Sequence, residues 1–284
     1  MDPMENEPYT PLLLGFVADL FFTVKIEAAA RQLNYRVHWI ERGEEATPFA
    51  AGRQYAEHLD GPGAGLLEQI TAWQPALIIF DLGNREVPWQ SWLPLIKSAP
   101  ATRRIPVLCF GSHVDVDSMR TAKERGADAV LARSRFVSDL PGLIQKYARL
   151  PDFAAIQEAC QEPPSALALR GLEEFNRGAY FEAHELLEEA WNEDESAACE
   201  LYRAVLQVAV AYLQIERGNY NGAMKMFLRL RQWMGPLPDD CRGVDVARLR
   251  EDARRAHEAL AALGKDRVGE FDRRLMRPVV YREV

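Results

Sequence analysis

The hydrophobic pattern in residues 11–150 alternates between short apolar runs and segments with apolar residues at helical spacing. Nearly continuous apolar runs of this length are typical of parallel strands that are buried on both faces. The runs cover residues 12–17, 37–40, 76–80, 105–110 and 129–131, and the helical segments cover 20–34, 63–73, 88–98, 115–126 and 137–148. This alternation predicts an α/β doubly wound fold with a five-stranded parallel sheet.

From Ser165 onward the strand pattern disappears and only helical spacing remains. The helical segments cover residues 165–177, 180–193, 196–217, 220–234, 244–263 and 265–276, and the third is apolar nearly all round, as expected for a central helix. The sequence R-G-A-Y-F-E-A-H (177–184) is echoed by R-G-N-Y-N-G-A-M (217–224). In each copy the glycine suits the left-handed turn that ends a helix. The pattern predicts an all-α bundle with tetratricopeptide-like helical hairpins.

Proline residues separate the two patterns. Pro151 and the pair Pro163–Pro164 enclose a short helical segment, and proline cannot continue a helix. Ser165 is suited to cap the helix that follows. The predicted organisation is a flexible tail over 1–10, an α/β domain over 11–150, a linker over 151–164 and a helical domain over 165–284. A length of 284 residues is compatible with two domains.

Charge and cysteine usage narrow the classes of function. The net charge of −8 argues against a general nucleic-acid or anionic-membrane binder, because both need a positive field. The apolar stretches are too short or too interrupted to span a bilayer, and the acidic start lacks the basic region of a signal peptide. Cys109, Cys160, Cys199 and Cys241 are widely spaced, so we expect reduced thiols and a cytoplasmic protein.

Three stretches in the first half resemble the receiver domain of bacterial response regulators: L-I-I-F-D-L (77–82), R-I-P-V-L-C-F-G-S-H (104–113) and G-A-D-A-V-L-A-R (126–133). The resemblance implies a pocket at the carboxyl ends of the strands. A receiver holds Mg²⁺ there on an acidic pair, and an aspartate accepts the phosphoryl group beside a hydroxyl and a lysine. Asp81 matches the phospho-acceptor and Asp19 matches one member of the acidic pair.

The chain departs from the receiver pattern around this pocket. The departures are Ala18 for the other acid, Gly111 at the hydroxyl position with Ser112 one residue late, Val130 for an aromatic residue, Arg133 for the lysine and Ser134 for a proline. Losing a carboxylate weakens a Mg²⁺ site. We therefore expect residues 11–150 to be a pseudo-receiver whose degenerate pocket, Asp19, Asp81, Ser112 and Arg133, is not phosphorylated, with Arg133 paired to Asp81. The alternative is a genuine phospho-switch through Asp81, with Mg²⁺ at Asp19 and Asp81.

The helical half resembles the family called domain of unknown function 309, a small all-helical fold. The resemblance spans about 165–235 and rests on F-N-x-G-x-Y-F-E-A-H-E-x-L-E-x-x-W (175–191), on the R-x-x-x-Q formed by Arg203 and Gln207, and on R-G-N-x-x-G-A (217–223). This family implies no established activity, so the chemistry has to be argued from the residues.

A polar cluster is the candidate for chemistry in this half. His184, Glu188 and Trp191 share one helical stripe, which we expect to face the margin of the core, and Arg203 and Gln207 would face it from the next helix. Three interpretations remain open. The cluster is a satisfied polar contact that fixes helix register, or a pocket for a small ligand or peptide with Trp191, Tyr202 and Tyr212 as walls, or a transition-metal site at His184 and Glu188. The last lacks an evident third ligand.

These patterns favour a non-catalytic regulatory or adaptor protein of bacterial signalling type, with no catalytic residues and no cofactor. The sequence shows no set of nucleophile, base and orienting residue, and no phosphate-binding glycine loop. The helical bundle would bind a protein partner or a ligand, and a homodimer is compatible with the sequence. The competing interpretation is a metal- or ligand-binding protein or an enzyme that acts through His184 and Glu188.

Overall fold

The computed structural model describes residues 10–43 and 63–282, which form two compact units that divide between Leu150 and Pro151. The flexible tail predicted for residues 1–10 lies, apart from Thr10, outside the described residues. Within the described ranges, none of the helices combines the length and apolar character needed to cross a bilayer.

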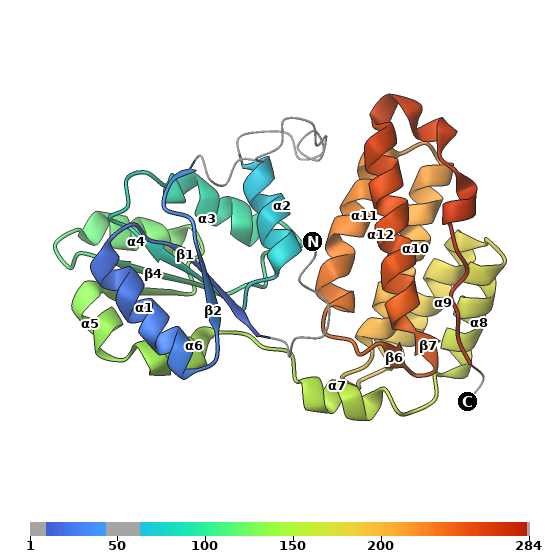
Figure 1. The fold of residues 1–284 in the computed structure, drawn as a ribbon, viewed down its shortest axis with the longest axis horizontal. Helices are drawn as coiled ribbons and strands as arrows, with labels where there is room; N and C mark the ends of the chain where they lie inside the picture. The colour runs from blue at the N-terminus through green and yellow to red at the C-terminus, as the bar shows by residue number, and fades with distance from the viewer. Residues whose placement is uncertain (1–9, 44–62, 283–284) are drawn as a thin grey trace. The chain divides into compact units, whose positions relative to one another are not determined.

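The first unit is built on the parallel sheet that the sequence predicts (Figure 1). Its strands are β1 (Leu12–Phe16), β2 (Arg36–Trp39), β3 (Leu77–Asp81), β4 (Val107–Gly111) and β5 (Ala129–Ala132). They lie in the order β2-β1-β3-β4-β5, which is a doubly wound order. Every residue of β1, β3 and β4 is buried, as their apolar runs require. In such a sheet, residues that follow β1 and β3 lie at the point where the chain changes direction of winding, which is where ligands usually bind.

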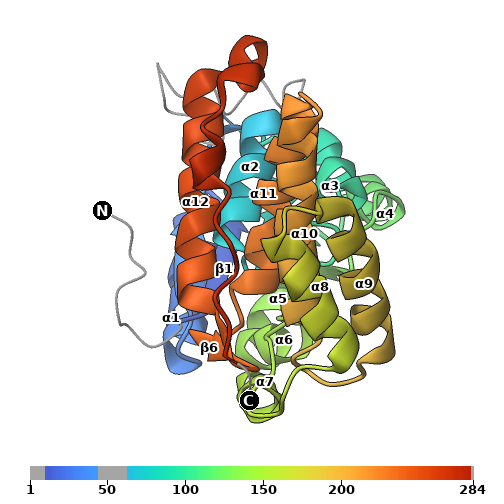
Figure 2. The ribbon, with the colours of Figure 1, turned by 90° about the vertical axis from the view of Figure 1, so that its right-hand side faces the viewer.

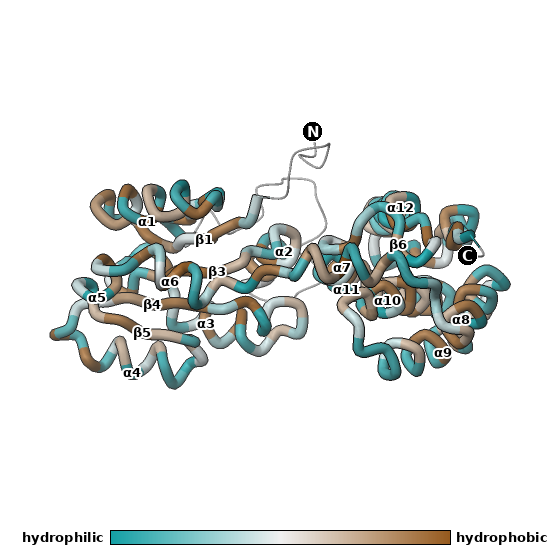
Figure 3. The backbone as a smooth tube through the Cα atoms, turned by 90° about the horizontal axis from the view of Figure 1, so that it is seen from below, coloured by the Kyte–Doolittle hydropathy of each residue, from teal (hydrophilic) through white to brown (hydrophobic). Residues whose placement is uncertain are grey.

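Helices cover both faces of this sheet. One face packs against α1 (Leu20–Gln32), α5 (Arg133–Ser138) and α6 (Leu140–Tyr147), and the other packs against α2 (Ala64–Trp73), α3 (Trp89–Ser98) and α4 (Val116–Glu124). Figure 3 shows the hydrophobic residues concentrated along the strands between these layers. A pair of stacked aromatic rings lies on each face of the sheet. The ring centroids are 4.1 Å apart for Phe110 and Phe136, on the face covered by α1, and 4.3 Å apart for Phe16 and Phe80, on the opposite face.

One helical segment of the first unit differs from the prediction. The sequence predicts a single helix over 137–148, whereas the structure has α5 beginning at Arg133 directly after β5, and then α6. Asp139 separates the two helices and accepts a hydrogen bond from the Gly142 N–H at 3.1 Å. Since a capping aspartate favours a new helix start, one pattern of apolar residues covers two helices here.

The second unit is helical, as predicted. It contains α7 (Phe153–Ala159), α8 (Ala166–Asn176), α9 (Tyr180–Glu193), α10 (Glu200–Glu216), α11 (Tyr220–Met234) and α12 (Val246–Leu263), followed by short 3-10 helices η3 (Lys265–Glu270) and η4 (Arg273–Leu275). Most residues of α10 are buried, which fits its predicted central place. Ser165 caps α8 by accepting a hydrogen bond from the Ala168 N–H at 3.1 Å.

The two echoed sequences form two equivalent helix ends. Gly178 and Gly218 have φ angles of 81° and 69°. The amide after each glycine donates to a carbonyl five residues back: Ala179 to Glu174 at 3.0 Å and Asn219 to Gln214 at 2.8 Å. This arrangement is a Schellman motif, which satisfies carbonyls that the helix itself leaves without partners. The helical-hairpin prediction is therefore confirmed.

A small β-hairpin was not expected in the second unit. Its strands are β6 (Asp240–Cys241) and β7 (Val244–Asp245), which pair antiparallel. The two turn residues, Arg242 and Gly243, both have positive φ angles, 53° and 77°, as a type I′ turn requires. Strands of two residues are too short to produce an alternating pattern, so no strand is evident after Ser165 in the sequence.

Residues 271–282, which contain η4 and are extended after it, complete the second unit and are called the strap below. Figure 2 shows it running past α12 toward the hairpin. Tyr281 pairs with Val244 as an isolated antiparallel bridge, so the strap adds a third short strand to β7.

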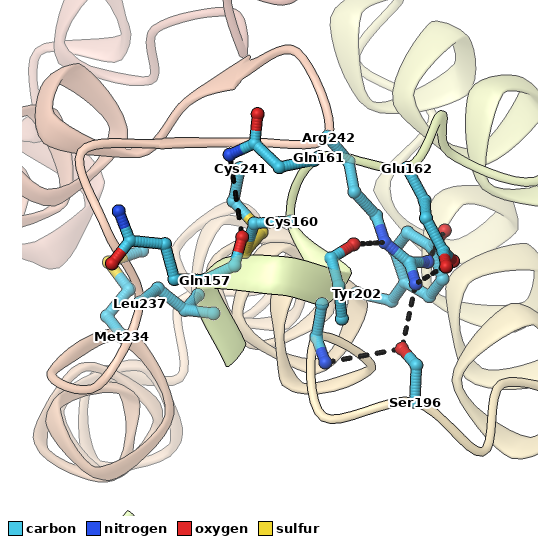
Figure 4. Close-up of a disulfide and its surroundings, with 12 residues drawn as sticks. Gln157, Cys160, Gln161, Glu162, Ser196, Tyr202, Met234, Leu237, Cys241 and Arg242 are labelled. Carbon is cyan, nitrogen blue, oxygen red and sulfur yellow. Dashed lines mark hydrogen bonds and ion pairs between the residues drawn. A yellow bond between two sulfur atoms is a disulfide. The ribbon is translucent and has the colours of Figure 1, made fainter. Parts of the chain in front are cut away.

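Cys160 and Cys241 form a disulfide (Figure 4). The expectation of reduced thiols throughout is therefore wrong for these two residues. Eighty-one positions separate them along the sequence, so no local motif marks the pair.

The proposed linker is attached to the helical unit. Two of its residues, Ile156 and Ala159, are buried in the helical core. The backbone N–H of Arg242 also donates a hydrogen bond to the Cys160 carbonyl at 2.7 Å.

Candidate functional site

The receiver-like pocket is centred on Asp81, the last residue of β3. Its side chain is only 4% exposed. One carboxylate oxygen, Oδ1, accepts a hydrogen bond from the Gly83 N–H at 2.9 Å and lies 3.4 Å from Arg133 Nη2. The same edge of the sheet thus brings together an acid from β3 and a cation that follows β5.

Arg133 covers the Asp81 carboxylate. A Cβ atom placed on Gly83 would lie 2.5 Å from Arg133 Nη2, so the guanidinium group sits directly against the glycine backbone. Its Cζ atom lies 5.4 Å from the centroid of the Phe22 ring, within the range of a cation–π contact. Arg133 is consequently held from two sides, by the carboxylate and by the aromatic ring.

The pKa of Asp81 is raised above its ordinary value, and burial is the main cause. The hydrogen bond from Gly83 and the charge of Arg133 act in the opposite direction, while the negative charge of Asp19 raises the pKa further. Burial therefore outweighs the ion pair at this carboxyl group, because desolvation disfavours the charged form.

The side chains of the other two predicted pocket residues, Asp19 and Ser112, accept hydrogen bonds from backbone amides. Asp19 caps α1, with Oδ1 accepting from the Phe21 N–H at 2.9 Å. The Ser112 hydroxyl accepts from the Val114 N–H at 3.4 Å. All four predicted residues lie at or just after the carboxyl ends of strands, but only Asp81 and Arg133 are in contact.

The pocket residues do not fit a magnesium site. Mg²⁺ prefers several hard oxygen ligands in octahedral geometry. Here Ala18 offers no carboxylate, Asp19 is engaged at the start of α1, and Arg133 places a positive charge against Asp81. In the part of the chain that the structure describes, no three His, Cys, Asp or Glu side chains gather as a metal-binding group.

The predicted cluster of the helical unit is organised around Arg203. Its Cζ atom lies 3.6 Å from the centroid of the Trp233 ring and 4.4 Å from that of Trp191. The guanidinium group is therefore held between one tryptophan from α9 and another from α11. Trp233 was not predicted, because a tryptophan on the buried face of α11 carries no polar signal in the sequence.

His184 and Glu188 are not drawn into this arrangement. Both residues were expected to face the margin of the core. His184 is half-buried there, but Glu188 is exposed, so the expectation is wrong for Glu188. Neither side chain forms a hydrogen bond or an ion pair with any residue that the structure describes. The Gln207 Oε1 atom is buried and has no hydrogen-bond partner among the described residues. The structure brings Trp191 and Arg203 together and leaves the remaining three residues outside that contact.

The two tyrosines proposed as pocket walls lie elsewhere. Tyr202 is hydrogen-bonded to Arg242, and its hydroxyl also accepts from the Ser165 N–H at 3.1 Å. Tyr212 donates to the Leu275 carbonyl of the strap at 3.5 Å. They therefore do not join Trp191 in a common wall.

Arg242, at the tip of the β-hairpin, is a buried residue that was not predicted from the sequence (Figure 4). Its Nη1 donates to Asp194 Oδ2 at 2.6 Å, and its Nη2 donates to Ser196 Oγ at 2.8 Å. Its Nε reaches the Ala159 carbonyl at 3.4 Å. With so many partners the guanidinium group is satisfied, and it joins the hairpin, α7 and the segment between α9 and α10. No local sequence signal marks it, because the flanking strands have only two residues each.

Comparison with families of known proteins gives one match, which lies within the second unit. Residues 168–226 match the family described as domain of unknown function 309, which confirms the resemblance for that segment. Among curated proteins, no sequence matches the chain significantly.

The first half is similar to solved receiver structures. One is a phosphorylated cyanobacterial phytochrome response regulator, RcpA, at 18% identity and a TM-score of 0.38, covering 51% of this chain and 100% of that one. Another is the receiver domain of a Pseudomonas aeruginosa sensor histidine kinase with a coordinated magnesium ion, at 16% identity and a TM-score of 0.38, covering 49% and 98%. A third is the chemotaxis response regulator CheY4 of Vibrio cholerae, at 12% identity and a TM-score of 0.37, covering 49% and 97%. The chain itself joins a unit with a doubly wound parallel sheet to a helical unit that contains the family segment.

Proposed function

We propose that this chain is a non-catalytic regulatory adaptor in which the receiver-like unit does not work as a phospho-switch and the helical unit binds a protein partner. The observation that carries the first part is the position of Arg133 against Asp81. We propose neither a metal nor a cofactor. A cytoplasmic location stays part of the proposal, although the Cys160–Cys241 disulfide is unusual for a reducing compartment.

The chemistry of phosphoryl transfer explains why this position matters. Transfer to an aspartate needs a carboxylate oxygen that is free to attack phosphorus in line with the leaving group, and a metal that neutralises the charge on the phosphoryl oxygens. The Asp81 side chain is 4% exposed, and Oδ1 is occupied by Gly83 and Arg133. Arg133 also places a positive charge against the carboxylate, where a bound metal would otherwise lie.

The second part of the proposal rests on what the helical unit offers. Glu188 is exposed and has no ligating partner, and the described residues hold no group of three metal-binding side chains, so a reaction centre finds little support there. The chain's net charge of −8 also disfavours nucleic acid as the partner. A protein partner is the class of ligand that fits both features.

The test is phosphorylation of the full chain. After incubation with acetyl phosphate and Mg²⁺, we expect no phosphoryl group on Asp81 by intact-mass measurement and peptide mapping. A variant that combines Ala18→Asp with Arg133→Lys restores the missing carboxylate and the lysine, and it serves as the matched control in which labelling of Asp81 is expected. Stoichiometric labelling of Asp81 in the unmodified chain would overturn the proposal.

A further inference from the structure

One residue of the strap is held through its backbone by a single side chain. Asn176, at the end of α8, donates from Nδ2 to the Val279 carbonyl at 2.9 Å and accepts at Oδ1 from the Val279 N–H at 2.7 Å. An asparagine amide carries both a donor and an acceptor, so it satisfies both polar groups of one residue. Such a contact recognises an extended backbone irrespective of the side chain.

The hairpin holds the next residues from the other edge. The Asp245 N–H donates to the Val280 carbonyl at 2.9 Å, and the Arg282 N–H donates to the Gly243 carbonyl at 2.9 Å. With the bridge between Val244 and Tyr281, residues 279–282 lie as an added antiparallel strand. Addition of an extended segment to a free strand edge is a common mode of peptide recognition.

The side chains of this added strand alternate in environment. Val279 is 3% exposed and belongs to the helical core, while its neighbour Val280 is 37% exposed. Tyr281 packs against the core, and Arg282 is exposed and pairs with Asp240. Pockets for alternate side chains give such sites their specificity, because successive residues of a strand point to opposite faces.

The rest of the strap contacts the core through Phe271 and through the partly buried Leu275 and Met276. Between the buried residues Phe271 and Val279, every side chain is exposed or only partly buried. By contrast, most of α10 is buried. Segments with few buried apolar contacts open locally at a lower free-energy cost than the core. We therefore expect the strap to detach while the helices remain folded.

We propose that Asn176 and residues 243–245 form a docking site for an extended segment of a partner protein, and that residues 279–282 occupy this site in cis. The partner segment would carry an apolar residue at the Val279 position, an aromatic residue two positions later and a basic residue after it. This site would be the partner-binding surface of the adaptor proposed above, so the inference rests on that function. Asn176 lies within the segment that matches the helical family, whereas the strap lies outside it, so the family segment recognises a separate stretch of chain.

The experiment uses the full chain and a fluorescent peptide with the sequence of residues 276–284. Val279→Asp in the chain disfavours docking of its own strap, so we expect this variant to bind the peptide about tenfold or more tightly than the unmodified chain does, since the site is then unoccupied. Val280→Asp is the matched control and should behave like the unmodified chain, because Val280 faces solvent. Fluorescence anisotropy measures the affinities.

Two further substitutions identify the contacts. Adding Asn176→Ala to the Val279→Asp chain removes both hydrogen bonds to the peptide backbone, and we expect a loss of affinity of about tenfold or more. A peptide that itself carries Val279→Asp should not bind. If the Val279→Asp chain is folded by circular dichroism and yet binds no peptide, the docking site does not exist.

Hydrogen exchange on the unmodified chain gives a measurement that needs no substitution. The amides of Val279, Asp245 and Arg282 should exchange well before those of α10. Equal protection in both places would mean that the strap is a permanent part of the core, and would overturn the proposal.

Two other outcomes separate this site from related possibilities. Straps exchanged between two copies, detected as a dimer by native mass spectrometry, would assign the site to self-association and overturn the assignment to a partner. Phosphorylation of Asp81 is measured independently, so its occurrence would overturn the adaptor role while leaving peptide binding unaffected.

Discussion

At Asp81, two opposing effects act on one carboxyl group. Burial raises its pKa, while the Gly83 amide and the Arg133 charge lower it, and the net direction is upward. The folded protein therefore binds a proton at Asp81 more readily than the unfolded chain does. Stability linked to this group is highest at low pH and decreases as the pH rises through the interval between the ordinary and the raised pKa.

Replacing Asp81 with Asn removes this linkage. Asparagine keeps an oxygen for the Gly83 N–H, and Arg133, whose side chain is 42% exposed, retains access to water. We expect Asp81→Asn to increase the free energy of unfolding at pH 7, and the increase to shrink as the pH falls through the raised pKa. Urea unfolding at several pH values measures this. Asp117→Asn, at a side chain that is 85% exposed, is the control and should show no such trend.

Arg242 presents the opposite case, a buried cation with a full set of partners. Arg242→Ala leaves Asp194, only 14% exposed, without its ion-pair partner. Breaking a buried pair on one side typically costs about 3–5 kcal/mol, so we expect a loss of this size in the free energy of unfolding, measured by urea titration. Arg120→Ala removes a pair in which both side chains are exposed, 64% for Arg120 and 85% for Asp117, and should cost about 1 kcal/mol or less. Equal losses in the two variants would show that the Arg242 network has no special stabilising role.

At the level of elements, the helical hairpin formed by α8 and α9 depends on the backbone conformation of Gly178. Gly178 has a φ of 81°, and an added Cβ would meet nothing within 4 Å. Any cost of Gly178→Ala therefore comes from the left-handed backbone alone, and we expect about 1 kcal/mol of destabilisation in urea unfolding. Gly178→Asn should cost less, because asparagine tolerates this conformation better.

Gly269 provides the matched control for this glycine. It also has open space around a Cβ, but its φ is not positive. Gly269→Ala should change the free energy of unfolding by less than about 0.5 kcal/mol. A comparable loss in both variants would contradict the role assigned to the Gly178 backbone.

The elements themselves were largely predictable, for local reasons. The strands of the sheet coincide with apolar runs in the sequence, and Gly178 and Gly218 mark the ends of α8 and α10. Helix α9 shows the limit of the argument. Sequence spacing placed Glu188 on the stripe of His184, but a stripe at the edge of a buried face does not determine which member turns to solvent. That outcome depends on the neighbouring helices.

At the scale of the whole molecule, the unpredicted features are contacts between distant residues. The pairing of Asp81 with Arg133 was expected because the ends of parallel strands meet at one edge of a sheet. The contacts of Arg203 with Trp233, of Arg242 with Asp194 and of Asn176 with Val279 follow no local pattern. These contacts depend on how the helices and the β-hairpin pack against one another. The spacing of apolar residues along one sequence does not reveal that packing.

The disulfide changes how the chain would respond to proteolysis. It closes a ring between Cys160 and Cys241 that contains α8, α9, α10 and α11. A single proteolytic cut in either glycine turn, at Gly178 or at Gly218, would leave the two fragments covalently joined. Helix α12 and the strap lie outside the ring, so one cut between Cys241 and α12 would leave them attached by noncovalent contacts alone.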